Sequence, residues 1–170
     1  MGDENKEQIS ECEEKWQKIE SDIQNYLNRI GAKSKHSPKA LDILTLSYDE
    51  IKSLTAYDCG EFSFILHQFA LFLQQEYNFH KSKIEWADNN IEYIFSNTYP
   101  SSGFISKESK LQHMNKLAGT NNNMKLLLNL KSKASVVCTN LEAISFKVGK
   151  LADSLENLQK MKGKNALTIS

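Results

Sequence analysis

Glycine and proline are scarce in this chain, which has 7 glycines and 2 prolines in 170 residues. Both residues interrupt helices, so their scarcity favours long, unbroken helices. The 3 cysteines, Cys12, Cys59 and Cys138, lie far apart and form no CxxC pair. This spacing implies neither a disulfide framework nor a zinc knuckle. Each cysteine is therefore expected to be a small, partly buried apolar residue in a reducing compartment.

Long apolar runs are also missing. The sequence has no stretch of 18 apolar residues, so we expect no membrane span. The N-terminus is acidic and lacks the apolar segment of a secretory signal, which predicts a cytoplasmic protein, in the host-cell cytoplasm if the source is viral.

A net charge of one sign is absent as well, since 21 basic residues balance 21 acidic ones. This balance excludes a global basic field that would attract nucleic acid. The charges are nevertheless uneven, with a net −7 over residues 1–103 and +7 over residues 104–170. Such asymmetry is typical of subunits that meet through opposite charges, or simply of solvated helix faces.

Motifs of catalysis and cofactor binding are absent too. None of the histidines (His36, His67, His80 and His113) has a second histidine three or four residues away. No phosphate-binding P-loop and no G-x-S-x-G nucleophile elbow occurs. His80 lies on an apolar stripe and is expected to be a packed histidine rather than a ligand. We therefore expect a protein that is not an enzyme, with no cofactor and no metal.

Helical periodicity is what the sequence has in abundance. Apolar residues recur at spacings of three and four over residues 55–96, which predicts one amphipathic helix of about 60 Å. So long a helix needs a partner along its length. Its first part, residues 62–73, is apolar on most sides and is expected to be buried, in the monomer or in an oligomer. The stripe consists of Leu66, Phe69, Leu73, Tyr77, His80, Ile84, Ala87, Ile91 and Ile94.

Two other segments carry heptad-like patterns. Residues 4–30 have apolar a and d positions and are followed by Gly31, a residue that commonly ends helices. A longer pattern near the C-terminus lasts about four heptads and predicts coiled-coil packing. The first set is Ile9, Cys12, Trp16, Ile19, Ile23, Tyr26 and Ile30, and the second is Leu127, Leu130, Ala134, Val137, Leu141, Ile144, Val148, Leu151, Leu155 and Leu158.

Capping and breaking signals divide the chain further. Pro38 opens one short helix, and the S-x-x-E pattern of Ser47 and Glu50 opens another. Residues 97–106 are expected to form a loop, and a second break is expected at residues 119–123. The expected divisions are an N-terminal coiled-coil helix (1–31), short linker helices (32–54), a long-helix core (55–162) and a frayed tail (163–170). The fold class is all-α: an elongated helical hairpin or bundle with long amphipathic helices and coiled-coil packing, which we expect to form a homo-oligomer.

Lysines mixed with aromatic residues give one signal for nucleic acid. Lys81, Lys83 and Trp86 lie close together in the long helix, and Lys107 and Lys110 open the next helical region. Phosphates need cations and bases stack on rings, so these five residues are the candidate single-stranded DNA contacts. A solvated helix face is the alternative explanation of the same pattern.

The order of elements resembles a known family over residues 56–160. The long helix is followed by the loop Tyr99-Pro100-Ser101-Ser102-Gly103, then by Lys107-Glu108-Ser109, a polar joint and a regular helix with a lysine-rich end. This order is similar to that of the UvsY recombination mediators of T-even-type bacteriophages. The resemblance implies a helical, ring-forming protein that binds single-stranded DNA and helps load a recombinase onto DNA coated by a single-strand-binding protein.

Two features depart from that family. Its members are rich in basic residues near the end of the long helix, whereas residues 85–96 here contain Glu85, Asp88 and Glu92 and no lysine or arginine. The N-terminal heptad segment has no counterpart in the family pattern. A second hypothesis is therefore a viral structural or assembly protein, or a coiled-coil scaffold, with no nucleic-acid role.

Overall fold

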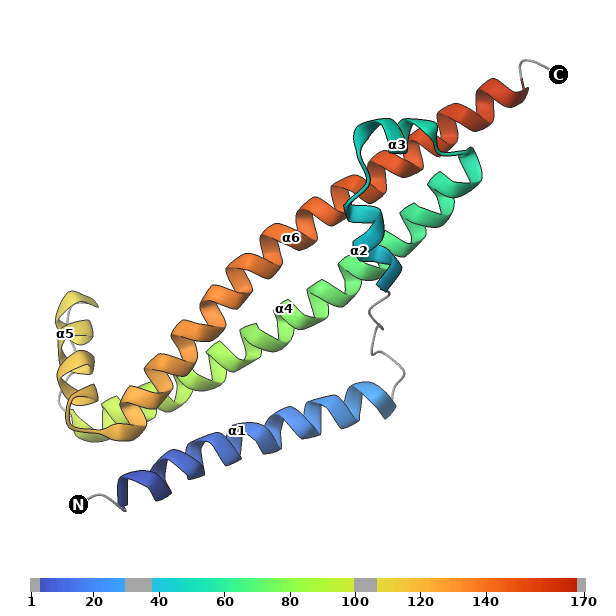
Figure 1. Ribbon diagram of the computed structural model, residues 1–170. Coiled ribbons are helices and arrows are strands. Elements are labelled where there is room, and N and C mark those ends of the chain that lie inside the picture. The colour runs from blue at the N-terminus through green and yellow to red at the C-terminus, as the bar shows by residue number, and fades with distance from the viewer. Residues whose placement is uncertain (1–3, 30–37, 100–106, 168–170) are drawn as a thin grey trace. The chain divides into compact units, whose positions relative to one another are not determined.

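The structure is a computed structural model that describes residues 4–29, 38–99 and 107–167. The described residues form helices and no strand, which confirms the all-α prediction. None of these helices is apolar over a length that would cross a bilayer. The helices are α1 (Glu4–Arg29), α2 (Pro38–Leu44), α3 (Tyr48–Ser53), α4 (Ala56–Thr98), α5 (Lys107–Ala118) and α6 (Asn122–Leu167) (Figure 1).

The two longest helices, α4 and α6, pack against each other as a hairpin (Figure 1). The predicted break between α5 and α6 is present. Gly119 and Thr120 form a turn, and the Asn121 side chain accepts a hydrogen bond from Met124 N–H at 3.0 Å as α6 begins. Asparagine is a favoured N-cap because its side chain satisfies an N–H that has no partner within the helix. Gly31, Ile30 and most of the expected loop, residues 100–106, lie outside the described residues.

Contacts divide the chain into two compact units, each built from separate segments. Unit 1 consists of Met1–Ala32 and Phe79–Val137, and unit 2 consists of Lys33–Asn78 and Cys138–Ser170. Both long helices therefore contribute one segment to each unit.

The core of unit 2 lies between the first half of α4 and the second half of α6, with α2 against them. Leu66 and Leu155 are almost completely buried there. The two helices approach closely enough here for the Ser63 hydroxyl to donate a hydrogen bond to the Ala152 carbonyl at 2.9 Å. The ammonium of Lys162 donates to the carbonyl of Lys52 at 2.8 Å and to that of Leu54, which satisfies carbonyls at the end of α3.

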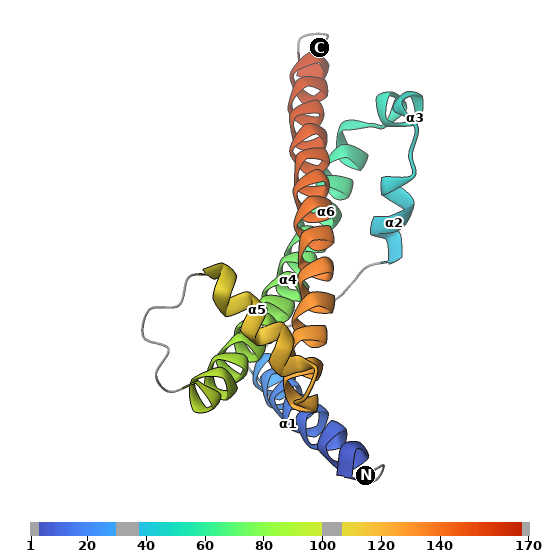
Figure 2. The ribbon, with the colours of Figure 1, turned by 90° about the vertical axis from the view of Figure 1, so that its left-hand side faces the viewer.

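The core of unit 1 lies between the second half of α4 and the start of α6. Ala87 and Met124 are completely buried there, and Ile91 almost completely. Helix α5 adds Leu117 and Met114 to this core, and Figure 2 shows α5 next to the unit 1 parts of α4 and α6. Phe95 is also buried, although it lies outside the stripe expected from the sequence.

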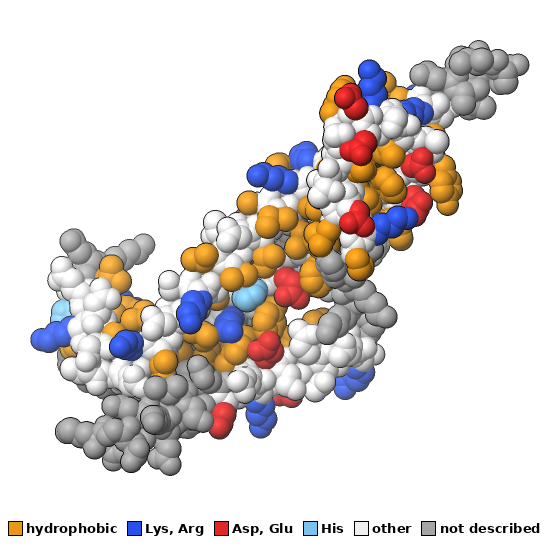
Figure 3. All heavy atoms as spheres, in the orientation of Figure 1, with side chains coloured by type: hydrophobic (Ala, Val, Ile, Leu, Met, Phe, Trp, Pro, Cys, Tyr) orange, Lys and Arg blue, Asp and Glu red, His pale blue; other side chains and the backbone are white. Residues whose placement is uncertain are grey.

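Some apolar side chains of α4 are exposed in the single chain, and two of them, Phe64 and Leu71, belong to the stretch 62–73 that is expected to be buried. Tyr57, Phe64 and Leu71 are 77%, 65% and 56% exposed, and they follow one another at intervals of seven residues. Residues seven apart lie on the same side of a helix, so these three form one stripe along α4, called here the α4 stripe. Figure 3 shows such exposed hydrophobic side chains on unit 2 among acidic and basic ones.

Two capping boxes fix the corner before α4. Ser47 and Glu50 form the predicted reciprocal pair at α3. In the second box, Thr55 N–H donates to the Asp58 carboxylate at 3.0 Å, and Asp58 N–H donates to the Thr55 hydroxyl at 3.1 Å. The hydrogen bonds from Thr55 lower the pKa of Asp58 below 3.8, and those from Ser47 lower the pKa of Glu50 below 4.5.

These lowered pKa values predict an acid-dependent loss of stability. A carboxyl whose pKa is lower in the folded state contributes stability that is present above its unfolded pKa and is lost as pH falls through its folded pKa. We expect the thermal midpoint of unfolding to decrease as the pH is lowered below about 4.5. In Asp58→Asn this decrease should be smaller than in the wild type. Thr55→Val removes the hydroxyl and keeps the Asp58 carboxyl, and it should also make the decrease in midpoint smaller. An Asp58→Asn profile parallel to that of the wild type would contradict the assignment.

Candidate nucleic-acid interface

An aromatic cluster joins α1 to α4 within unit 1. Trp16 of α1 is only 4% exposed. The centroid of its ring lies 5.8 Å from that of Phe79 and 5.5 Å from that of Trp86, and the angles between the ring planes are 55° and 54°. Such ring pairs are stabilised beyond the area they bury. The heptad pattern predicted an apolar Trp16, and the structure shows that α4 is the helix it packs against.

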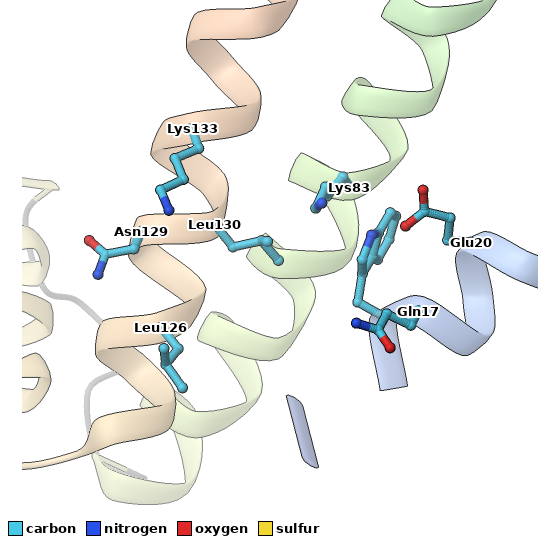
Figure 4. A pocket seen from close by; sticks show the side chains of 8 residues that line it. Gln17, Glu20, Lys83, Leu126, Asn129, Leu130 and Lys133 are labelled. Atoms are coloured by element: carbon cyan, nitrogen blue, oxygen red, sulfur yellow. The ribbon is translucent and has the colours of Figure 1, made fainter. Parts of the chain in front are cut away.

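Lys83 connects this cluster to an open cavity. Its ammonium lies 5.1 Å from the centroid of the Trp16 ring, a cation–π distance. The cavity, of about 370 Å³, lies beside it between α1 and α6. Figure 4 shows Lys83 from α4, with Glu20 of α1 on one side and Lys133 of α6 on the other. The lining is completed by Trp16, Gln17, Leu126, Asn129 and Leu130.

The chemistry of the cavity suits an anionic group attached to a flat, partly apolar one. Lys83 and Lys133 are cations for which the described residues offer no carboxylate within ion-pair distance. Gln17 and Asn129 supply amide donors, and Leu126 and Leu130 supply an apolar wall. Glu20 is the only acid among the lining residues. A phosphate with its attached base matches this combination of groups.

The other residues predicted to contact DNA are not gathered at this cavity. Lys81 is exposed and lies two positions from Lys83, which places it on a different side of the helix. Lys110 forms an ion pair with Glu92 at 2.5 Å and lies 5.3 Å from the Phe95 ring centroid. The side chain of Lys107 is outside the described part of the chain.

Comparison with known protein families, characterised proteins and solved structures finds no match. The resemblance to the UvsY family therefore stays a prediction.

Sequence reasoning missed the contribution of α6 to this site. Asn129 and Lys133 lie about 50 residues from Lys83 in the sequence, and only the hairpin brings them together. A signal was present in their spacing, because residues four apart lie on the same face of a helix. The heptad pattern predicts that Trp16 lies on a coiled-coil seam, but it does not identify the helix that Trp16 packs against.

A cluster of possible metal ligands lies in unit 2. Ligand atoms of His67, Asp153 and Glu156 all lie within 4.8 Å of one another. Glu156, however, already pairs with Lys160 at 2.6 Å, and this pairing lowers the pKa of Glu156. Asp153 and His67 are about half exposed, with 3.9 Å between the carboxylate and the ring nitrogen. This is the arrangement of a surface ion-pair network, which needs no metal to hold it.

Proposed function

We propose that this protein is a non-enzymatic, single-stranded DNA-binding recombination mediator that acts as a homo-oligomer. Its partners would be single-stranded DNA, other copies of the chain, a recombinase and a single-strand-binding protein. The last two partners rest on the resemblance to the UvsY family alone.

The observation that carries this proposal is the meeting of Lys83 and Lys133 at one cavity lined by Trp16, whose ring packs on Trp86. Binding to single strands without sequence preference needs cations for the phosphates and ring or apolar surfaces for the bases. Unit 1 provides both within a single site. The cavity is small, at about 370 Å³, so a strand needs further contacts, for which exposed Lys81 and Lys125 are available on the same unit.

A second function is favoured by a different observation. The α4 stripe is a regularly spaced apolar surface that no described part of the chain covers. A protein that acts only as an assembly or scaffold component would use this stripe and need no cationic cavity. The two functions differ in whether DNA binds at all, and a binding measurement separates them.

Lys83→Ala with Lys133→Ala tests the DNA-binding function. We expect the wild type to bind a labelled 30-nucleotide oligothymidine in fluorescence anisotropy, with an affinity that falls as salt rises. Each phosphate contact on a single strand contributes about −0.7 to the slope of log K against log salt concentration. The slope of the double variant should therefore be less steep than that of the wild type by about 1.4. Its binding at about 50 mM salt should be about ten- to hundredfold weaker.

Lys52→Ala with Lys147→Ala is the matched control, because it removes the same charge from exposed positions of unit 2. This control should bind nearly as tightly as the wild type. An equal loss in both double variants would mean that charge alone matters and that the cavity is not the site. No binding by the wild type at about 50 mM salt, where the electrostatic contribution is strong, would favour the scaffold function.

A further inference from the structure

We propose, on the basis of the DNA-binding function above, that α1 is a displaceable arm that occupies part of the nucleic-acid surface of unit 1. In the docked state, Trp16 takes the place of a base on that surface and Glu20 lies where a phosphate would approach. Single-stranded DNA then competes with α1 for the same groups of α4. The arm would therefore lower the affinity for DNA until a strand displaces it.

The position of Trp16 is the main argument. Lys83 and Trp86 are the groups of α4 that a nucleotide would use, as a phosphate partner and a stacking surface. Trp16 already occupies both, with its ring against Trp86 at 5.5 Å and below the Lys83 ammonium at 5.1 Å. A base and an indole ring make the same kinds of contact with an aromatic ring and a cation, so the two cannot use these groups at once.

The charge of α1 supports the same conclusion. Between Glu4 and Arg29 the helix carries seven acidic and four basic residues, a net charge of −3. One of the acids, Glu20, lines the cavity together with Lys83 and Lys133. An acidic helix against a cationic surface imitates the polyanion expected there, and it repels a strand as long as it stays docked.

The docking of α1 is also suited to release. Among the side chains described on this helix, residues 14–29, Trp16 is the only buried one. Its indole Nε1 and the Gln24 Oε1 atom are both buried without a hydrogen-bond partner in the described structure. Buried polar groups that lack partners weaken an interface, because they give up hydrogen bonds to water without replacement.

The open cavity allows a strand to make its first contacts while α1 is still docked. Lys133 and Asn129 are exposed on α6 and lie on the side of the cavity away from α1. A phosphate held by Lys133 would bring its neighbouring base next to Trp16. Displacing Trp16 would then expose Lys83 and Trp86 for the same strand.

Trp16→Ala in the full-length chain tests this inference, with binding of the labelled oligothymidine as the measurement. If α1 is docked about nine-tenths of the time, removing its anchor should tighten binding about tenfold, since the competent fraction limits the apparent affinity. Glu20→Gln should tighten it by less, about twofold. Asp22→Asn is the matched control for charge, because Asp22 is exposed on α1 and does not line the cavity; it should bind like the wild type.

Trp86→Phe provides a second measurement on the arm itself. This variant keeps an aromatic ring for stacking and leaves Trp16 as the one remaining tryptophan of the 2 in the chain. Saturation with oligothymidine should shift its fluorescence to longer wavelength as Trp16 becomes exposed to water. An unchanged emission at saturation would mean that α1 stays docked and would overturn the inference.

The outcomes separate this inference from the function on which it rests. Tighter binding by Trp16→Ala than by the wild type supports both. A wild type that binds DNA as tightly as Trp16→Ala, or more tightly, overturns the displaceable arm and leaves the DNA-binding function standing. Absence of binding by both proteins overturns the DNA-binding function and the arm together.

Discussion

Val148→Asp should abolish the cooperative folding of unit 2. Val148 is 2% exposed and lies in the same core as Leu66 and Leu155. An aspartate there loses the apolar contacts of valine and places a carboxylate in an apolar core. The expected cost is about 4 kcal/mol or more, which is much of the about 5–15 kcal/mol that stabilises a typical domain.

Circular dichroism during thermal unfolding measures this effect, with a loss of helix signal at 25 °C as the expected result. Asn140→Asp is the control, because it adds the same charge at an exposed position of the same helix. Its expected effect is below about 0.5 kcal/mol. A Val148→Asp protein with a wild-type midpoint would mean that α4 and α6 do not share this core.

Phe64→Glu with Leu71→Glu should convert an oligomer into monomers. Both residues belong to the α4 stripe, and heptad spacing is the pattern by which one helix packs on another. Exposed apolar stripes of this kind mark surfaces that pack against a partner. Two carboxylates in such an interface would lie unpaired opposite apolar side chains, which costs several kcal/mol in an assembly.

Light scattering during size-exclusion chromatography gives the mass directly. The measured mass of the wild type should be a multiple of 19.4 kDa, and that of the double variant should be 19.4 kDa. Asn140→Glu with Asn157→Glu adds the same two charges at exposed positions of α6 and should keep the wild-type mass. A wild type of 19.4 kDa at micromolar concentration would refute self-association through the stripe.

The sequence was most informative where a local rule decides the structure. Ser47 with Glu50 predicted the start of α3, and Gly119 with its asparagines predicted the break before α6. These predictions succeeded because caps and breaks depend on residues within one turn of each other. The periodicity of three and four also identified both long helices, because one side of each is buried along the hairpin.

The candidate site was predictable only in part, because it depends on contacts between distant segments. Lys83 and Trp86 were chosen from their proximity along α4, and both contact Trp16. Lys81 was chosen for the same reason, yet it points elsewhere, because spacing by two residues separates side chains around a helix. Lys110 was a candidate because it lies at the start of the next helical region, and its pairing with Glu92 depends on how α5 packs on α4.

The hairpin also bears on the order in which the chain folds. Contacts of α6 with α4 in unit 1 join residues that are closer in the sequence, such as Lys131 and Asp88, which are 43 apart. Contacts of α6 in unit 2 join residues that are farther apart, from 61 for Cys138 and Tyr77 to 110 for Lys162 and Lys52. The entropy lost on closing a loop grows with its length. Closure that begins at the α5 end therefore lets each later contact form across an already shortened loop, and Lys162 would be among the last residues to find its partners.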